Sequence, residues 1–303
     1  MNKNVFAVVN PAAGAGRCGR RAPRALAYLQ AAGLSLDVAT TTAPRQAAAL
    51  VREAYARGHR KFLAVGGDGT AFDIVNGLFP YIPQLNQMDR PALGFLPLGT
   101  GNSFLKDFEY SGIQQTADAL ALDRCRSCDV IRLIHADGEF YFINLLTLGF
   151  AADVAALANR RFKELGTIGY LLAVIGSVAT LERRAFPLRV DEPAEFDRRT
   201  CLFLAFCNTR CTGGNMIIAP DANQADGLIE YVRWGPIGRL GLLRNLPRLF
   251  DGSHTTHALA SRAGVRTVEF NLEGPVNATL DGESMQLQCQ RLEILPAALD
   301  ILI

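Results

Sequence analysis

An excess of charge of either sign is missing from this sequence of 303 residues. Lysine and arginine total 31 against 29 aspartates and glutamates, so the formal net charge at neutral pH is only +2. A chain that binds nucleic acid through its phosphates usually carries a basic excess, over the domain or in local clusters. The charge balance gives no sign of such a partner, and we expect no nucleic acid to bind.

A disulfide framework and a metal-binding cluster are also missing. The seven cysteines are odd in number and scattered along the chain, which is typical of reduced thiols in a cytoplasmic protein. The closest pairs, Cys125 with Cys128 and His254 with His257, have no further ligand at metal-binding spacing. We expect the two histidines to lie in a solvent-exposed loop.

No apolar run is long enough to predict a membrane span. The longest one, residues 165–181, falls just short of the required length and contains three glycines, so it favours a buried or interfacial helix. The apolar run at the N-terminus is too short for a signal peptide and has no small-residue cleavage site. We therefore expect a cytoplasmic protein, with peripheral association with a membrane left open.

The first half of the chain alternates between strand-like and helical segments. Strand-like runs at 5–10, 34–40, 61–67 and 92–97 are separated by Ala-rich stretches such as 45–58. This alternation predicts a parallel sheet with helices on its faces. We expect a Rossmann-like parallel α/β domain over residues 1–132.

Three glycine-rich motifs follow strands of this expected sheet. NPAAGAGR (10–17) follows the first strand, GGDGT (66–70) the third and PLGTGNSF (97–104) the fourth. Ligands gather at the carboxyl ends of parallel strands, and glycine lets backbone N–H groups approach a phosphate closely. Together the motifs predict phosphate binding, although none is a Walker loop and the first is not a G-x-G-x-x-G fingerprint.

The second half of the chain is rich in strand-like runs. Two helical stretches, at about 151–163 and 166–182, interrupt them. We expect an antiparallel, β-sandwich-like second domain over residues 133–290, with the return of the chain end, 291–303, to the first domain left open. The strand-like runs are 138–150, 185–191, 200–208, 227–234, 267–283 and 290–296.

The ordered set of motifs resembles the diacylglycerol kinase catalytic family, which are lipid kinases that include sphingosine and ceramide kinases and bacterial relatives. The resemblance covers essentially the whole chain and implies ATP-dependent transfer of the γ-phosphate to a lipid hydroxyl, in a cleft between two domains. It rests on VNPAAGAG at the start, GGDGTAFDIVNGL (66–78), PLGTGNSF (97–104), LLTLGFAADV (145–154), GTIGYLLA (166–173), GGNMIIAPDANQADGLIE (213–230) and NLEGPVNATLDGE (271–283).

The resemblance also implies a nucleotide site. The ATP phosphates would lie against the first two glycine motifs, and Thr41 and Thr100 would complete the site from neighbouring loops. Backbone amides, hydroxyls and Mg²⁺ would supply the positioning and charge neutralisation that phosphoryl transfer needs. The residues implied are Asn10, Pro11, Ala12, Ala13, Gly14, Thr41, Gly66, Gly67, Asp68, Gly69, Thr70, Ala71, Phe72 and Thr100.

The family places its general base in a D-G-E element, here Asp281-Gly282-Glu283. We expect Glu283 or Asp281 to take the proton of the acceptor hydroxyl, because a carboxylate is a suitable base. By the same resemblance, Asp68 would organise magnesium and the phosphates, and Asp129 would belong to the same metal and water network. The residues alone would favour another interpretation of Asp281-Gly282, a hairpin turn.

A structural magnesium site in the second domain is implied as well. By position its ligands would be Asn223, Asp226 and the backbone carbonyl of Leu228. The family usually has an acidic pair before the glycine that follows. Here Asn223 and Ala225 remove negative charge that a hard cation prefers.

Two further positions depart from the family pattern. Phe72 stands where an asparagine is common, and Ser103 stands where an aspartate is common. These departures keep two alternatives to a lipid kinase open: a soluble-substrate kinase related to NAD kinases, and a nucleotide-binding regulator without catalysis. Neither the acceptor lipid nor the oligomeric state follows from the sequence.

One segment combines apolar side chains with positive charge. Residues 233–250 interleave leucines, a tryptophan and a phenylalanine with four arginines. This pattern suits an interfacial helix on anionic lipid, where a lipid substrate would be met at the membrane surface. It is equally typical of an amphipathic helix packed on the core.

Overall fold

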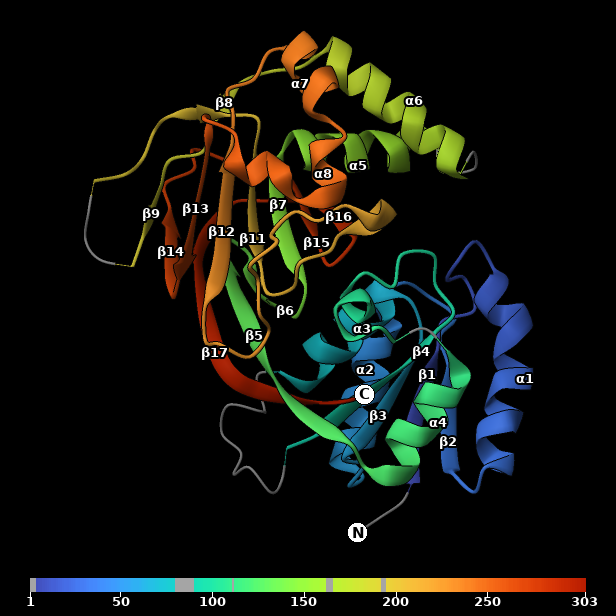
Figure 1. The fold of residues 1–303 in the computed structure, drawn as a ribbon. Coiled ribbons are helices and arrows are strands. Elements are labelled where there is room, and N and C mark those ends of the chain that lie inside the picture. Colours follow the sequence, from blue (N-terminus) through green and yellow to red (C-terminus); the bar gives the residue numbers. More distant parts are fainter. Residues whose placement is uncertain (1–3, 80–89, 111, 162–165, 192–194) are drawn as a thin grey trace. The chain divides into compact units, whose positions relative to one another are not determined.

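The computed structural model describes residues 4–79, 90–110, 112–161, 166–191 and 195–303. The chain folds into two compact units (Figure 1): unit 1 comprises Met1–Val130 and Leu295–Ile303, and unit 2 comprises Ile131–Ile294. The chain end, which the sequence left open, thus belongs to unit 1.

A parallel sheet forms the centre of unit 1. Its strands are β1 (Asn4–Val9), β2 (Ser35–Thr40), β3 (Lys61–Gly66), β4 (Ala92–Pro97) and the end of β17 (Cys289–Leu302). Their order across the sheet is β2-β1-β3-β4-β17, and every neighbouring pair is parallel. β1, β3 and β4 are buried along most of their length, which explains why they appear in the sequence as continuous apolar runs.

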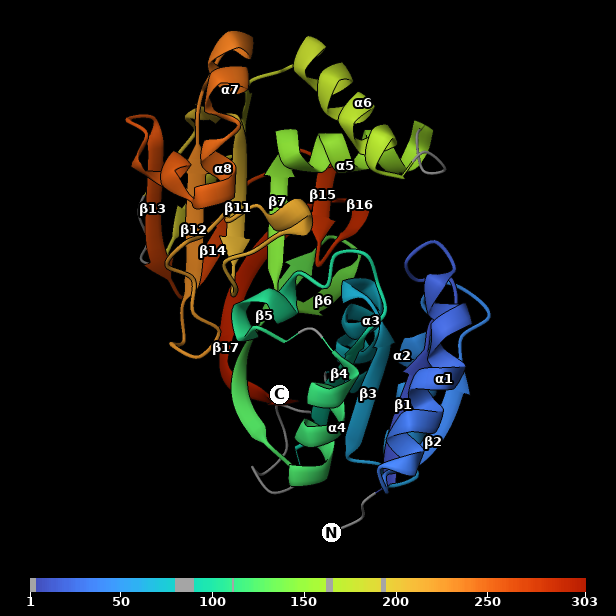
Figure 2. The ribbon, with the colours of Figure 1, turned by 45° about the vertical axis from the view of Figure 1, so that its right-hand side comes forward.

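Helices cover the sheet of unit 1. They are α1 (Arg17–Ala31), α2 (Gln46–Ala56), α3 (Asp68–Leu78) and α4 (Ile113–Leu122), with a short 3₁₀ turn, η3 (Phe104–Phe108). α1 packs with α4 and α2 with α3, and the two pairs lie on different faces of the sheet (Figure 2). α1 buries Cys18, Ala22, Ala25 and Leu29, a spacing that places them on one helical face.

An antiparallel sheet of six strands dominates unit 2. The strands are β7 (Leu145–Gly149), β11 (Phe203–Cys207), β12 (Ile229–Trp234), β13 (Ala260–Val265), β15 (Val276–Leu280) and β16 (Glu283–Leu287). Their order is β13-β12-β11-β7-β15-β16. Trp234 is fully buried and packs edge-to-face against Phe203, so the sheet and the helices that cover it share one core.

The remaining elements of unit 2 complete its layers. β14 pairs antiparallel with β17 and β9, β5 pairs with β6, and β8 with β10. The strands are β5 (Cys125–His135), β6 (Gly138–Phe142), β8 (Arg184–Ala185), β9 (Leu188–Val190), β10 (Thr200–Cys201) and β14 (Thr267–Phe270). The helices are α5 (Phe150–Arg161), α6 (Gly166–Ala179), α7 (Arg239–Asn245) and α8 (Arg248–Asp251), with the 3₁₀ turns η5 (Gly213–Asn215) and η6 (Ser253–Thr256).

The fold confirms the expected class, a parallel α/β region followed by an antiparallel β-rich region. Several details of the prediction were wrong. The run 138–150 is two strands, β6 and β7, and the sequence missed β13 and β16. Both missed strands lie at edges of the six-stranded sheet, where side chains are polar or small and the apolar alternation is weak. The predicted helix at 151–163 corresponds to α5, and residues 162 and 163 lie outside the described residues.

The structure also bears on the predictions about the apolar run 165–181, the cysteines and the histidines. Within the described residues, no helix is both long and apolar enough to cross a membrane, and α6 begins at Gly166. All seven cysteines are free. The exposed-loop prediction for His254 was wrong, because its side chain is fully buried beside Trp234 and Phe203.

Candidate functional site

The three glycine-rich loops of unit 1 meet at one edge of its sheet. The loops follow β1, β3 and β4, which are neighbours in the sheet, so their carboxyl ends lie side by side. The backbone N–H of Gly99 donates to the carbonyl of Gly66 over 2.7 Å. Arg17 joins the first loop to the third, because its guanidinium donates to the Gly14 carbonyl at 3.0 Å and to Thr100 Oγ1 at 3.1 Å. The predicted convergence of the three motifs is confirmed.

Several glycines in these loops have no room for a side chain. A Cβ on Gly99 would lie 2.5 Å from the Cα of Gly67, and one on Gly66 would lie 2.2 Å from Thr70 Oγ1. Gly14 has a φ of 63°, and a Cβ there would lie 2.9 Å from the carbonyl oxygen of Leu98. The loops therefore form a cradle of bare backbone, which is the kind of surface that phosphate groups approach.

Two helices begin at this cradle. α1 starts at Arg17, directly after the first loop, and α3 starts at Asp68, directly after the second. The first backbone N–H groups of a helix have no partner within it, and the helix dipole is positive at that end. At α1 the first amides already donate to carbonyls of the first loop, from Arg17 to Gly14, from Cys18 to Ala13 and from Gly19 to Pro11. The start of α3 is therefore the helix start that best fits a nucleotide phosphate.

Asp68 connects two of the loops. Its carboxylate accepts hydrogen bonds from the backbone N–H groups of Ser103, at 3.0 Å, and Phe104, at 3.3 Å. Burial raises the pKa of the Asp68 carboxyl above its ordinary value, while these amides and the positive charge of Lys106 oppose that change. Asp68 thus holds the loop after β4 against the start of α3. Its predicted role toward magnesium stays a prediction.

Two threonines near the cradle differ in their contacts. Thr41 is buried and its hydroxyl donates to the Val9 carbonyl at 3.3 Å. The Thr70 side chain is 2% exposed, and its Oγ1 has no hydrogen-bond partner among the described residues. A buried hydroxyl without a partner is uncommon in proteins, so Thr70 has hydrogen-bonding capacity to spare next to the cradle.

The other residues predicted to line the nucleotide lie in the glycine-rich loops or in the first residues of α3. Asn10 accepts a hydrogen bond from the Ala12 amide at 3.2 Å and so shapes the first loop. Ala71 and Phe72 lie inside α3 with buried side chains, so they contribute packing rather than polar contacts from those side chains. Ser103, the other departure from the family pattern, is buried and holds Asp68 through its amide.

The structure places Asp281 at a tight hairpin turn. Asp281 and Gly282 connect β15 to β16, and both have positive φ, 46° and 88°. The Asp281 carboxylate is 2% exposed and accepts three backbone N–H groups at 2.9–3.0 Å, from Ile143, Asn144 and Leu145. The hairpin interpretation is therefore confirmed, and this side chain ties the turn to the start of β7.

Glu283 differs sharply from Asp281. It begins β16 and its side chain is exposed to solvent. Ser284, Met285 and Gln286, the next three residues of the same strand, line a pocket of unit 2. Of the two carboxylates predicted as base, Glu283 is the one that faces solvent.

The residues predicted to bind magnesium lie in two parts of the fold. Asn223 and Asp226 share a loop, but each side chain accepts an amide two residues further on, from Ala225 at 3.1 Å and Leu228 at 2.9 Å. No group of three or more His, Cys, Asp or Glu side chains placed for a metal occurs in the described part of the chain. Asp129 is buried in unit 1 and accepts the Ala297 amide at 2.6 Å. The metal assignments stay predictions.

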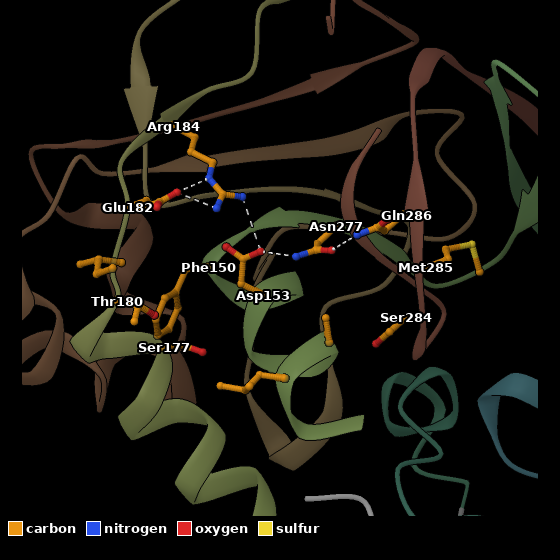
Figure 3. Close-up of a pocket in the computed structure, with 13 residues that line it drawn as sticks. Phe150, Asp153, Ser177, Thr180, Glu182, Arg184, Asn277, Ser284, Met285 and Gln286 are labelled. Carbon is orange, nitrogen blue, oxygen red and sulfur yellow. Dashed lines mark hydrogen bonds and ion pairs between the residues drawn. The ribbon is translucent and has the colours of Figure 1, made fainter. Parts of the chain in front are cut away.

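A pocket of about 620 Å³ opens in unit 2 (Figure 3). It lies among α5, α6, β15, β16 and the segment that leads into β8. Its walls are part apolar and part polar. The lining residues are Phe150, Asp153, Ala156, Leu157, Ser177, Thr180, Leu181, Glu182, Arg184, Asn277, Ser284, Met285 and Gln286.

Asp153 organises the polar wall of this pocket. Its carboxylate accepts a hydrogen bond from Asn277 Nδ2 at 2.7 Å and pairs with Arg184 at 3.7 Å. Arg184 also pairs with Glu182 at 2.7 Å, and Gln286 donates to Asn277 at 3.3 Å. Figure 3 shows these groups as one chain of contacts along the pocket.

No motif in the sequence predicted this pocket. Phe150 and Asp153 lie in LLTLGFAADV, and Asn277 lies in NLEGPVNATLDGE, two of the motifs that carried the family resemblance. An acidic residue within an otherwise apolar run was the available signal. Its partners are distant in the chain, so spacing alone could not bring them together.

Comparison with known proteins matches both halves of the chain to described families. Residues 4–133 match the family described as diacylglycerol kinase catalytic domain, and residues 144–303 match the YegS C-terminal NAD kinase beta sandwich-like domain. The chain is 32% identical to a Pseudomonas putida protein named "Probable lipid kinase YegS-like", over 91% of this chain and 88% of that protein. The chain belongs to the diacylglycerol kinase family of lipid kinases.

Other relatives of this family cover nearly the whole chain. A protein of Mycobacterium tuberculosis named "Diacylglycerol kinase" is 28% identical over 98% of this chain and 94% of that protein. The crystal structure of a diacylglycerol kinase from Bacillus anthracis has the same fold, with a TM-score of 0.74 at 22% identity over 99% of this chain and 96% of that one. The family resemblance found in the sequence is confirmed, and the chain is a kinase.

Proposed function

We propose that this diacylglycerol kinase family member transfers the γ-phosphoryl group of ATP to the hydroxyl of a lipid. The observation that carries the proposal is the cradle of unit 1, where three glycine-rich loops and two helix starts meet. Bare backbone and positive helix ends suit the triphosphate. Mg²⁺, when bound, would neutralise the charge that develops on the phosphoryl oxygens.

We assign the general base to Glu283 rather than Asp281. The three amide donors on Asp281 stabilise its charged form and occupy the oxygens that would have to take a proton. Glu283 is exposed and begins a strand that continues into the pocket wall. In the proposed step, Glu283 accepts the hydroxyl proton, the acceptor oxygen bonds to the γ-phosphorus, and the bond to the leaving oxygen of ADP breaks.

We assign the acceptor to the pocket of unit 2. Its apolar side chains, such as Phe150 and Leu157, suit the first carbons of an acyl chain or a long-chain base. The Asp153 network suits hydroxyls next to them, since a carboxylate and an amide side chain can orient a polar headgroup. That the reaction takes place between the two units stays a prediction.

A soluble acceptor and a non-catalytic regulator are the alternatives. Radiolabelled γ-phosphate should be followed from ATP into a panel of vesicles containing diacylglycerol, a sphingoid base, ceramide or phosphatidylglycerol. Label in one chloroform-extractable product, lost in Glu283→Gln and retained in Glu273→Gln, the same change at an exposed glutamate outside the pocket lining, would support the proposal. Label in water-soluble product alone, or ATP binding without transfer to any acceptor, would reject it.

Asp153→Asn separates acceptor recognition from chemistry. The change removes the charge that pairs with Arg184 while keeping the size of the side chain. We expect KM for the lipid to rise about tenfold with little change in KM for ATP, because the nucleotide cradle lies on other residues. A rise in both constants together would argue against an acceptor pocket at this position.

A further inference from the structure

The segment 233–250 separates into a buried and an exposed set of apolar side chains. Trp234, Leu242 and Leu249 are 0–7% exposed and belong to the core of unit 2. Leu240 is 83% exposed, Leu243 50% and Phe250 56%. The prediction of one amphipathic helix was wrong, because β12 ends at Trp234 and two short helices, α7 and α8, follow.

Helical spacing explains which leucines of α7 face outward. Leu240 and Leu243 are three residues apart and therefore share a face, while Leu242 lies on the opposite side and is fully buried. Burial of Leu242 fixes the rotation of α7 on the core. The two exposed leucines are held outward by that packing rather than left over from a loosely placed helix.

Positive charge accompanies these side chains. Arg244 and Arg248 are exposed on the same two helices, and Asp251 is the one acidic residue between 239 and 251. Arg233 does not contribute, because it is buried and donates to the Thr200 carbonyl. Arg239 is exposed and keeps its positive charge while it donates to the Val178 carbonyl at 3.2 Å. The exposed part of the segment is thus apolar and basic together.

α6 extends this surface toward the pocket. Arg239 connects the start of α7 to Val178 near the end of α6, and Figures 1 and 2 both show the two helices next to each other. Ile175 of α6 is 59% exposed, and Ser177, two residues on, lines the pocket. We call Ile175, Leu240, Leu243, Arg244, Arg248 and Phe250 the outer face.

We propose that the outer face docks unit 2 on the surface of an anionic phospholipid membrane. Leucine and phenylalanine side chains on short helices can enter the headgroup region, while arginines beside them pair with lipid phosphates. Four such apolar side chains expose on the order of a few hundred Å², less than the roughly 800 Å² per partner of a standard protein interface. Charge and area therefore favour a lipid surface over a second copy of the chain.

Membrane docking gives the pocket a supply of acceptor. α6 contributes Ser177 to the pocket and Ile175 to the outer face, so this one helix borders both the pocket and the docked membrane. This last step rests on the proposed kinase function. The docking itself does not, and it can be measured without ATP.

Flotation with vesicles tests the docking on the full chain. Vesicles of phosphatidylcholine alone are compared with vesicles that also contain phosphatidylglycerol. We expect the wild type to float with the anionic vesicles, and Arg244→Gln with Arg248→Gln to weaken binding about 30-fold, since each basic residue near such a surface contributes a factor of about five. Leu240→Ser with Leu243→Ser should weaken binding at least tenfold on both kinds of vesicle.

Matched variants on unit 1 provide the control. Leu122 is 67% exposed, and Arg21 and Arg24 are exposed on α1. Leu122→Ser, and Arg21→Gln with Arg24→Gln, should bind vesicles like the wild type. Unchanged binding of the outer-face variants, or no vesicle binding by the wild type, would overturn the proposal. So would a wild-type dimer in light scattering that the leucine variants abolish.

Activity measurements distinguish failure of docking from failure of the proposed function. With the lipid acceptor dispersed in detergent micelles, outer-face variants should turn over like the wild type, and on anionic vesicles they should lose activity in proportion to binding. A wild type that binds vesicles but transfers no label would reject the kinase assignment and leave the docking in place. Equal losses on micelles and vesicles would show that the outer face acts on folding or chemistry instead.

Discussion

Two of the Asp-Gly pairs of this chain, Asp68-Gly69 and Asp281-Gly282, have an aspartate whose carboxylate accepts backbone amides from a segment distant in the sequence. Asp281 takes three amides and is 2% exposed, within a hairpin of unit 2. Asp68 takes two amides, at the start of a helix where glycine-rich loops meet. The same residue pair thus fastens a hairpin in one unit and joins two glycine-rich loops in the other. The groups around each aspartate, rather than the Asp-Gly pair itself, determine its role.

The largest expected effect is loss of stability on Asp281→Ala. Three buried amides would lose their acceptor, and an unsatisfied buried N–H costs about 1–3 kcal/mol. We expect the free energy of unfolding to fall by about 4 kcal/mol in urea denaturation. Wild-type stability together with abolished phosphoryl transfer would instead make Asp281 the base and reverse the comparison.

Glu283→Gln should have the opposite profile. Its side chain is exposed, so the melting temperature should stay within the error of the wild type. Loss of a positioned base lowers turnover by roughly 100-fold or more. Label transfer to the lipid found in the vesicle panel measures this, with ATP affinity as the control. Turnover within about twofold of the wild type would remove Glu283 from the mechanism.

Asp68→Ala should lower the free energy of unfolding by less than Asp281→Ala does. It should also release the loop after β4 from the start of α3. Two amides lose their acceptor at a partly exposed site, so we expect about 2 kcal/mol of destabilisation. ATP affinity should fall as well, because the loop after β4 is no longer held against α3. Thr116→Ala, which removes a buried hydroxyl bonded to Phe95 elsewhere in unit 1, controls for general loosening. Equal loss of ATP binding in both variants would argue against a specific role of Asp68.

The cradle could be predicted from the sequence because each of the motifs that form it is local. Each glycine-rich motif follows a continuous apolar strand, and the parallel order of such strands brings their ends to one edge. The order of the motifs along the whole chain was enough to identify the family. Neither inference needed a contact between side chains that are distant in the sequence.

The pocket and the hairpin could not be predicted in the same way. Asp153 meets Asn277 and Arg184, which lie far along the chain, and Asp281 meets Ile143 through Leu145 only after β7 and β15 pair. Composition also predicted the wrong burial for some residues, because tertiary packing decides which side chains are enclosed. His254 looks like a solvated loop residue but packs against the rings of Trp234 and Phe203. In the segment 233–250, Trp234, Ile237, Leu242 and Leu249 belong to the core.

The smallest expected effect concerns the titration of Asp68. Because burial raises its pKa, the folded state holds that proton more tightly than the unfolded state, whose pKa stays near 3.8. Between those two values the folded state binds more protons, so stability increases as pH falls through the folded-state pKa and stops changing below about 3.8. Asp68→Asn removes this titration. The difference in unfolding free energy between wild type and Asp68→Asn should therefore shift toward the wild type as pH is lowered.

Urea denaturation at a series of pH values measures that difference. Every other titratable group is present in both the wild type and Asp68→Asn, so the difference between the two proteins isolates the titration of Asp68. If acidification instead stabilises Asp68→Asn relative to the wild type, the two amide hydrogen bonds change the pKa of Asp68 more than burial does. The hydrogen bonds from the backbone amides would then dominate at Asp68, and the two Asp-Gly pairs would differ in location alone.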